Sequence, residues 1–347
     1  MAKPVRYGGQ AVIEGVMMRG AKTFAVACRR ANGEILVRDE PVPAFFTRYA
    51  WAKLPFLRGV FALADSLVLG MKSLLFSANL AMEDQQAAAA ASAEAGEPPD
   101  TPGAPPMGPL TQALLGPVWL FVAAGGLPGG GAISSISVTG SAILGLALGI
   151  GLFMILPGLA AQWLTPILGE TIWRAVVEGL MRVALMLGYI ALIGRMKEVQ
   201  RVFQYHGAEH KAINALETEG TLDVDAAVRA SRIHPRCGTN FVLTVLIIKM
   251  LVVMVLPWQE KLHLIVLLRL ALLPLVASIS FEIIRLAGTY RDIAPLQWLV
   301  TPGLLTQQLT TREPARDMVE VAVASLQRVM QREGALPAED SPAAAVA

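Results

Sequence analysis

The sequence predicts an α-helical integral membrane protein with about four transmembrane helices, with six as the alternative, and a small cytosolic N-terminal segment that contains β structure. Three observations predict this class. The 347 residues are 54% hydrophobic and only 16% charged, whereas a soluble domain averages about 25% charged residues. The mean hydropathy of the chain is +0.53. No Lys or Arg occurs between Lys72 and Arg174, while the flanking segments are rich in both.

The N-terminal region, residues 1–53, is predicted to be a cytosolic β-hairpin region. Two apolar stretches flank Asn32-Gly33, and an Asn-Gly pair in that position is a strong hairpin signal. Upstream, GGQAVIEGVMMRG places four glycines around a short apolar run. We interpret this run as a strand with glycine turns rather than as a ligand-binding loop.

Residues 54–82 are predicted to form an amphipathic or membrane-associated helix. Arg58, Asp65 and Lys72 fall seven residues apart, so their charges share one face of an otherwise apolar rod. Such a helix fits the membrane interface or the side of a bundle better than a position across the bilayer, because charges within a span are costly. Residues 83–109 are rich in Ala, Pro and Glu and are predicted to be a disordered linker.

Four later stretches approach the ~20 apolar residues that cross a bilayer. They divide between a membrane region, residues 110–194, and a membrane hairpin, residues 241–288. A further apolar stretch, 110–127, is interrupted by Gly-Pro, and we interpret it as half-inserted or packed on the bundle. If it and residues 54–82 both span the membrane, the count becomes six. The four predicted spans are residues 136–160, 173–194, 241–257 and 263–287.

Basic residues predict the orientation, because cytoplasmic loops of membrane proteins carry the excess of Lys and Arg. Nearly all Lys and Arg lie in the N-terminal region, in residues 195–240 and in the C-terminal tail. Four spans place these three segments on one side. We therefore predict a multi-pass protein of the cell (inner) membrane with both termini in the cytoplasm. Six spans leave residues 195–240 on the same side.

The C-terminal segment, residues 289–334, is predicted to be cytosolic and to be helical after Pro314. Apolar residues recur there at helical spacing, which indicates a helix that packs on the cytosolic domain. Residues 335–347 are predicted to be a disordered tail. The apolar stripe consists of Met318, Val319, Val321, Val323, Leu326, Val329 and Met330.

The cytosolic segment between the spans contains QYHGAEHK, in which His206 and His210 stand four residues apart on a predicted helix that ends near Gly220. Residues four apart lie one turn above each other, so both imidazoles can meet at one ion. Glu209 lies on the adjoining face, as the general base does in the inverted zincin motif H-x-x-E-H. We predict Glu209 as the catalytic residue, although a five-residue pattern also arises by chance.

The downstream sequence HPRCGTN strengthens the metal hypothesis. It follows the predicted helix after a loop of ~20–25 residues, which is long enough to bring it back over that helix. Three of the four histidines and one of the two cysteines thereby gather in one segment. The ligand types favour zinc, with the third ligand supplied by either the cysteine or the histidine of this loop. The predicted metal ligands are His206, His210, Cys237 and His234.

Other interpretations of these residues stay open. The histidines could be interfacial side chains bonded to carbonyls or phosphates, and Cys237 could be a small buried hydrophobe. Within the spans, Glu178, Arg182 and Arg269 are either ion pairs that hold the bundle together or the lining of a polar cavity.

Five segments of the chain carry a family resemblance: GGQAVIEGVMMRG, FQYHGAEHKAINALE, HPRCGTNF, ISFEIIRLAG and PGLLTQQLTTREP. They resemble the YqhQ-like family of bacterial membrane proteins of unknown function. The resemblance covers most of the chain except residues 83–135. It implies that the histidine motifs lie between membrane spans. Members of the family are often labelled as predicted metal-dependent enzymes, a label that rests on the same motifs.

Three functions are compatible with these observations. The first is a polytopic membrane protein with a cytosol-facing metal site that acts as a metal-dependent hydrolase. The second is a non-enzymatic membrane assembly or scaffold protein, in which the metal is a structural clip. The third is a transporter, which is disfavoured because no internal repeat relates the pairs of spans. The expected partners are the lipid bilayer and other membrane proteins. Nucleic acid is not expected, because the net charge is only +2.

Overall fold

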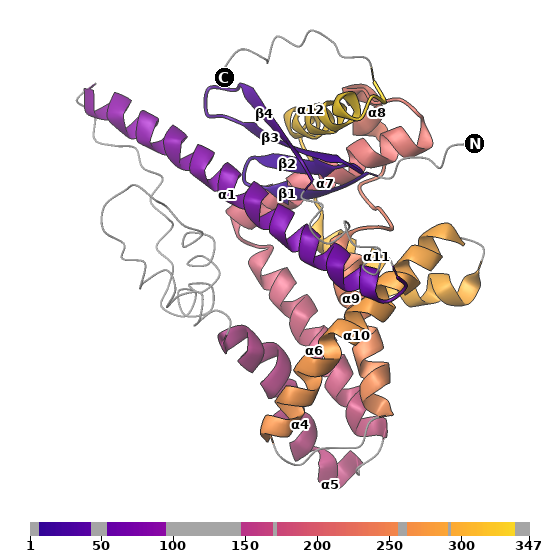
Figure 1. Cartoon of the computed structure of the whole chain (residues 1–347). Coiled ribbons are helices and arrows are strands. Elements are labelled where there is room, and N and C mark those ends of the chain that lie inside the picture. The colour runs from indigo at the N-terminus through magenta and orange to yellow at the C-terminus, as the bar shows by residue number, and fades with distance from the viewer. Residues whose placement is uncertain are drawn as a thin grey trace.

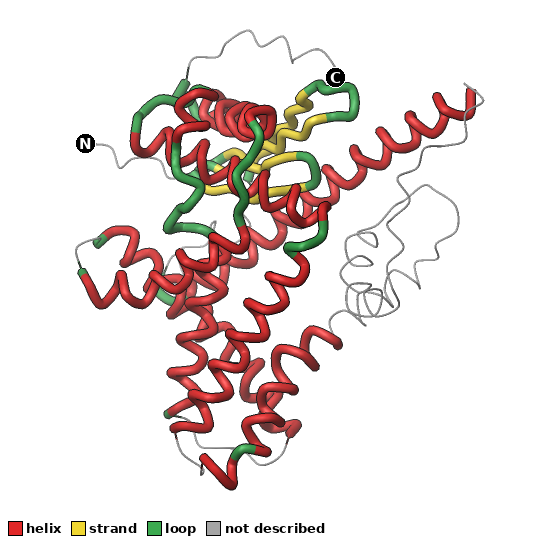
Figure 2. The backbone as a smooth tube through the Cα atoms, turned by 180° about the vertical axis from the view of Figure 1, so that it is seen from behind, coloured by secondary structure: helices red, strands yellow, loops and turns green. Residues whose placement is uncertain are grey.

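The protein consists of two layers (Figure 1): a small sheet with helices beside it at one end, and a bundle of longer helices at the other. Viewed from behind in Figure 2, all of the described strands lie in the first layer, which we call the sheet layer. The fold is therefore mostly helical with a small N-terminal antiparallel sheet, as the sequence predicts. The structure, a computed structural model, describes residues 7–42, 54–94, 147–168, 172–255, 262–290 and 293–336.

The sheet is antiparallel with strand order β1-β2-β3-β4, so each strand pairs with its neighbour in sequence. The hairpin predicted around Asn32-Gly33 joins β3 to β4, and Gly33 has a φ of 88°, a conformation that glycine adopts without strain. The GGQAVIEGVMMRG segment is the hairpin of β1 and β2, as predicted. The strands are β1 (Gly8–Val12), β2 (Gly15–Arg19), β3 (Thr23–Arg29) and β4 (Ile35–Pro41).

One face of the sheet is covered by the C-terminal helix α12 (Arg316–Arg332) and by α7 (Lys197–Thr218). Every member of the predicted apolar stripe on α12 is buried. Ser325 Oγ of α12 also donates a hydrogen bond of 3.0 Å to the carbonyl oxygen of Ala25 in β3. The short helix α8 (Val224–Arg229) completes the layer. The core of the sheet layer thus joins residues from both ends and the middle of the chain.

Helix α1 (Leu57–Glu94) crosses obliquely between the sheet layer and the bundle (Figure 1). Its three charges share one face, as their spacing predicts, and each meets a partner from another element. This face therefore packs on protein, whereas Leu63, Leu67 and Met71 are exposed on the opposite face. The pairs are Arg58 with Glu282 of the bundle, Asp65 with Arg19 of β2, and Lys72 with Glu40 of β4.

The predicted linker is helical in its first part. Residues 83–94 continue α1 without interruption, because their Ala-rich sequence has the highest intrinsic helix propensity. Asp84 anchors this part, since Arg30 Nη2 donates to its Oδ1 at 2.6 Å. The rest of the predicted linker, residues 95–109, lies outside the described residues, as do residues 110–146 and 337–347.

Among the described residues, the bundle is built from two long helices, α6 (Ile172–Ile193) and α10 (Leu262–Thr289), and several shorter ones. The shorter ones are the π-helix η2 (Gly151–Ile155), α4 (Leu156–Trp163), α5 (Thr165–Leu168), α9 (Gly238–Met254) and α11 (Ala294–Thr310). Helix α11 packs on α9 and leads from the bundle back to the sheet layer.

The number of membrane-length helices differs from the predicted four. By length and composition, three described helices can cross a membrane: Leu57–Ala88, Ile172–Ile193 and Leu270–Ala287. The first belongs to α1, for which the sequence favoured an interfacial position. Two predicted spans give shorter apolar helices, Ala147–Trp163 and Gly238–Met254. The first of these two changes from π- to α-helical geometry near Pro157, and the second ends just before Pro257.

The charges of α6 lie inside the bundle. Glu178 and Arg182 are buried, and Arg182 Nη2 donates a hydrogen bond of 2.6 Å to Glu178 Oε1. Arg182 Nε donates to the carbonyl oxygen of Phe153 at 2.8 Å. These contacts support the interpretation that the charged residues of this helix hold the bundle together. The side chain of Arg269 lies outside the described part of the chain.

Candidate metal centre

The HGAEH sequence lies in the middle of α7, where the helix passes between the sheet and the end of α11. The helix ends at Thr218, and Gly220 follows with a φ of 69°, in agreement with the predicted stop. The rings of His206 and His210 lie one turn apart in an edge-to-face arrangement, with centroids separated by 4.5 Å. The predicted four-residue spacing therefore places both imidazoles on one face.

His206 is oriented by the carbonyl oxygen of Thr310, at the end of α11. Its Nδ1 lies 2.8 Å from that oxygen. A carbonyl can only accept a hydrogen bond, so Nδ1 carries the proton and Nε2 presents its lone pair. That Nε2 lies 3.1 Å from the Sγ atom of Cys237.

His210 has the same arrangement on the next turn. Its Nδ1 donates to the carbonyl oxygen of Arg232 at 2.7 Å. Its Nε2 is buried, and no atom of the described residues forms a hydrogen bond with it. Metal-ligating histidines show this pattern, in which one ring nitrogen is fixed by a carbonyl and the other is left for the ion.

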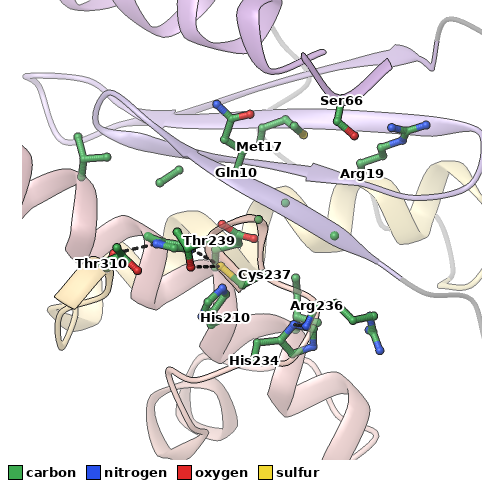
Figure 3. A pocket seen from close by; sticks show the side chains of 18 of the residues that line it. Gln10, Met17, Arg19, Ser66, His210, His234, Arg236, Cys237, Thr239 and Thr310 are labelled. Carbon is green, nitrogen blue, oxygen red and sulfur yellow. Dashed lines mark hydrogen bonds between the residues drawn. The ribbon is translucent and has the colours of Figure 1, made fainter. Parts of the chain in front are cut away.

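Cys237 completes the group from the residue before α9 (Figure 3). Its buried Sγ lies 3.2 Å from the Thr239 hydroxyl. One ligand atom each from His206, His210 and Cys237 lies within 4.8 Å of the other two, so these residues could hold a metal ion. Two imidazoles and a thiolate suit zinc, and three protein ligands leave the fourth tetrahedral position open.

Polar side chains of α7 bring the loop back over the helix. Lys211 Nζ donates to the carbonyl oxygens of Val228 and Ala230, at 2.9 and 3.0 Å. Asn214 Nδ2 donates to those of Ser231 and Ile233, at 2.6 and 3.0 Å. The sequence did not point to a role for Lys211 or Asn214. Their positions four and seven residues after Gly207, which place both side chains on one face of α7, were the only indication that they act together.

His234 lies beside this group and faces another partner. Its Nδ1 accepts a hydrogen bond of 3.4 Å from the backbone N–H of Arg236, so Nε2 carries the proton and lies 3.5 Å from Glu217 Oε2. Burial lowers the pKa of the His234 imidazole, against the opposing effect of Glu217. Of the two candidates for the third ligand, the structure thus brings Cys237 to the histidine pair.

Glu217 pairs with His234 and Arg236 and does not belong to the metal-ligand group. Burial favours a higher pKa for this carboxyl, but hydrogen bonds from His234 and Arg236 and the charge of Arg236 outweigh it and lower the pKa to about 2. The carboxylate therefore stays ionised. It fixes the proton-bearing side of His234, which keeps that ring directed away from Cys237.

Glu209 lies on the adjoining face of α7, against strand β1. The backbone N–H of Gly9 donates to its carboxylate. A Cβ atom on Gly9 would lie 2.8 Å from Glu209 Cγ, so only glycine allows this approach. Burial raises the pKa of Glu209 to about 7, although His206 and the Gly9 hydrogen bond lower it. Sequence reasoning missed Gly9, for which the paired glycines of GGQAV were the only signal.

The three ligand residues and Glu209 line a single cavity of about 790 Å³. Figure 3 shows Gln10, Arg19 and Ser66 on its sheet side, with His210, Cys237 and Thr310 across from them. Sites of this volume take ligands the size of a small molecule. The candidate centre is therefore accessible to a ligand larger than water.

Gly207 lies against the backbone of Arg312, two residues after Thr310, and its replacement by alanine is expected to disturb the site. A Cβ atom there would overlap the carbonyl oxygen of Arg312. We expect Gly207→Ala to destabilise the protein by about 1–3 kcal/mol and to weaken metal binding, because α11 must move away from His206. Thermal unfolding in detergent and elemental analysis measure the two effects.

The matched control is Gly188→Ala in α6, where an added Cβ meets no atom within 4 Å among the described residues. This variant should unfold at the wild-type temperature or slightly above it. Equal stability of Gly207→Ala and the wild type would show that the close approach of α7 and residue 312 is not needed.

Together, the fold and the site define a mostly helical protein that has membrane-length helices and a His/His/Cys group able to hold a metal ion. The chain belongs to a family of proteins of unknown function, DUF1385, whose profile matches residues 54–332. It is 33% identical over 334 residues to the uncharacterized protein YqhQ of Bacillus subtilis (strain 168), which covers 95% of this chain and 94% of that protein. The predicted resemblance is thereby confirmed. No solved structure matches the chain.

Proposed function

We propose that this protein is a polytopic membrane protein with a metal-dependent hydrolase centre that faces the cytoplasm. The observation that carries the proposal is the shared tautomer of His206 and His210. Both donate Nδ1–H to a backbone carbonyl, which leaves Nε2 as the ring nitrogen available to an ion in each residue. A core histidine without a ligand would not be expected to leave a buried Nε2 without a hydrogen-bond partner, as His210 does among the described residues.

The chemistry follows from the residues around the group. When bound, a zinc ion would polarise a carbonyl or phosphoryl oxygen and acidify water. Glu209 lines the same cavity and has a carboxylate held by Gly9, so it can accept a proton from water and return it to a leaving group. The sheet layer covers this carboxylate and excludes bulk solvent from it.

The orientation is part of the proposal. The Lys and Arg asymmetry supports a cytoplasmic location for the sheet layer, the metal-ligand group and both termini. The structure supports a common side, because residues 7–42, 197–237 and 316–332 pack in one layer. A reporter enzyme that works only in the cytoplasm should be active when it is fused after Gly220. Activity of a periplasmic or extracellular reporter at this position would contradict the orientation.

Glu209→Gln is expected to separate catalysis from metal binding. The amide keeps the size of the side chain and loses the proton acceptor. Hydrolysis of a panel of ester, phosphoester and amide compounds should fall by about 10²–10⁴-fold, while the metal content stays at the wild-type level. The measurement is the metal-restored activity of detergent-purified protein after chelation, alongside elemental analysis. Unchanged hydrolysis in Glu209→Gln would exclude this residue as the base.

A second function is favoured by one observation, the position of the group where three segments meet. His206, Cys237 and the end of α11 at Thr310 come from separate parts of the chain. A metal there would act as a structural clip in a non-enzymatic assembly protein. In that case chelation would lower the unfolding temperature strongly, and no compound in the panel would be hydrolysed by metal-restored protein.

A further inference from the structure

The cavity at the candidate centre extends beyond the metal-ligand group, and part of its lining is apolar. It is lined by Leu69 of α1, Ile190 and Ile193 of α6, and Val202 and Phe203 of α7. Helices α1 and α6 are two of the three described helices that are long and apolar enough to cross a membrane. One cavity therefore joins membrane-type helices to a polar metal-ligand group.

Two arginines contribute to the polar lining of the cavity, Arg19 from β2 and Arg236 from the loop before α9, and the carboxyl group of Glu209 also lines it. Arg236 is paired with Glu217, but Arg19 lies 3.9 Å from Asp65, a loose contact for an ion pair. Burial lowers the pKa of Arg19, although Asp65 opposes the effect. A partly desolvated guanidinium next to an open volume favours an anionic ligand group.

The geometry points to an anionic amphiphile from the bilayer as the ligand of this cavity. Its tail would lie along Leu69, Ile190 and Ile193, and its anionic head group would lie between Arg19 and the group of His206, His210 and Cys237. This inference rests on the proposed function, of which it names the substrate class. Hydrolysis of such a head group would add the hydroxyl group of water to its acyl carbon or phosphorus and break the bond from that atom to the ester oxygen. The ester oxygen would leave as an alcohol with the other proton of water, so no further reactant is required.

The size of the cavity agrees with this ligand class. About 790 Å³ is within the range of roughly 300–1,000 Å³ found for small-molecule sites. The volume holds a head group and the first part of a chain. A fully polar substrate would leave Ile190 and Ile193 in contact with water, which costs about 25 cal/mol for each Å² of apolar surface.

Binding of a fluorescent phosphatidic acid to full-length, metal-loaded protein in detergent micelles tests the inference. Three unlabelled competitors separate the parts of the ligand: a long-chain phosphatidic acid, a diacylglycerol without charge, and glycerol 3-phosphate without a tail. We expect the first to compete at least about tenfold better than either of the others, because each lacks one of the two contacts. Equal competition by glycerol 3-phosphate would identify a site for a free phosphate compound and overturn the inference.

Ile193→Trp fills the apolar wall and should weaken probe binding by about tenfold or more, with an unchanged metal content. The matched control is Leu192→Trp, since Leu192 is the neighbouring residue on α6 and is exposed. This control should bind the probe as the wild type does. Equal weakening in both variants, or in neither, would overturn the assignment of the tail site.

The same preparations distinguish this inference from the proposed function. Metal-free wild-type protein that still binds the probe, with the loss confined to Ile193→Trp, would support the amphiphile site and contradict the metal proposal. Metal-containing protein that does not bind the probe would support the metal proposal and contradict the amphiphile site.

A photoreactive group on the lipid tail gives a test in the wild-type chain if Ile193→Trp does not fold. Cross-links to residues 66–69 and 190–203 would support the inference. Cross-links only to exposed residues of the bundle would contradict it.

Discussion

His210→Ala protein purified from membranes is expected to lose nearly all of its bound metal. In the proposed site the imidazole is one of three ligands, and because its Nδ1 donates to the Arg232 carbonyl, Nε2 is the nitrogen left for the ion. Loss of a supporting contact alone lowers metal affinity by about 10–100-fold, so loss of the ligand itself should lower it further. Elemental analysis of dialysed protein gives the metal content. Cys237→Ser should show the same loss with less change in side-chain volume.

His234→Ala is the control for this experiment. The residue is equally buried and lies nearby, with its ring centroid 5.7 Å from that of His210. Because His234 pairs with Glu217, the variant should retain its metal. If His234→Ala lost the metal and Cys237→Ser kept it, the third ligand would be His234, and the position of the loop would have to be revised.

Glu178→Ala is expected to have the largest effect on the stability of the bundle. The substitution removes the carboxylate that receives Arg182 Nη2 at 2.6 Å and leaves the guanidinium buried. Breaking a buried ion pair from one side costs about 3–5 kcal/mol. The free energy of unfolding, measured by denaturant titration in detergent, should fall by this amount.

Two further variants test the cause of that loss. Replacement of both partners, Glu178→Leu with Arg182→Leu, should recover part of the stability, because neither member of this ion pair is then left buried without the other. Arg174 stays buried on the same helix in every variant. Glu219→Ala removes an exposed partner of Arg229 and should cost less than about 1 kcal/mol. A loss below 1 kcal/mol for Glu178→Ala would mean that the charges of α6 are solvated, as in a polar pathway.

The sequence predicts the features of the site that depend on local geometry. The four-residue spacing of His206 and His210 determines that both rings share a face of α7, and Gly220 determines where that helix stops. The apolar spacing on α12 and the Asn-Gly hairpin are equally local. In each case the period of a helix or the conformation of a turn is enough to give the result.

The features that the sequence does not give depend on contacts across the chain. Cys237 and His234 are both within reach of α7, and the choice between them depends on hydrogen bonds that Lys211 and Asn214 donate and on the pairing of His234 with Glu217. The contact of Gly9 with Glu209 joins residues 200 positions apart in the sequence. Hydrophobicity alone also cannot separate a helix that crosses a bilayer from one that packs obliquely on a sheet, as α1 does.

The pairing of the N-terminal sheet with the C-terminal helix determines the order of biogenesis. Strand β3 is translated about 300 residues before Ser325, which donates to Ala25, and before Arg328, which donates to Asp39 of β4. The apolar face of the sheet therefore lacks the cover of α12 until the last helix has been synthesised. The ribosome must release the last helix before this layer can close, so a nascent chain halted ahead of residue 316 would expose that face to chaperones and proteases.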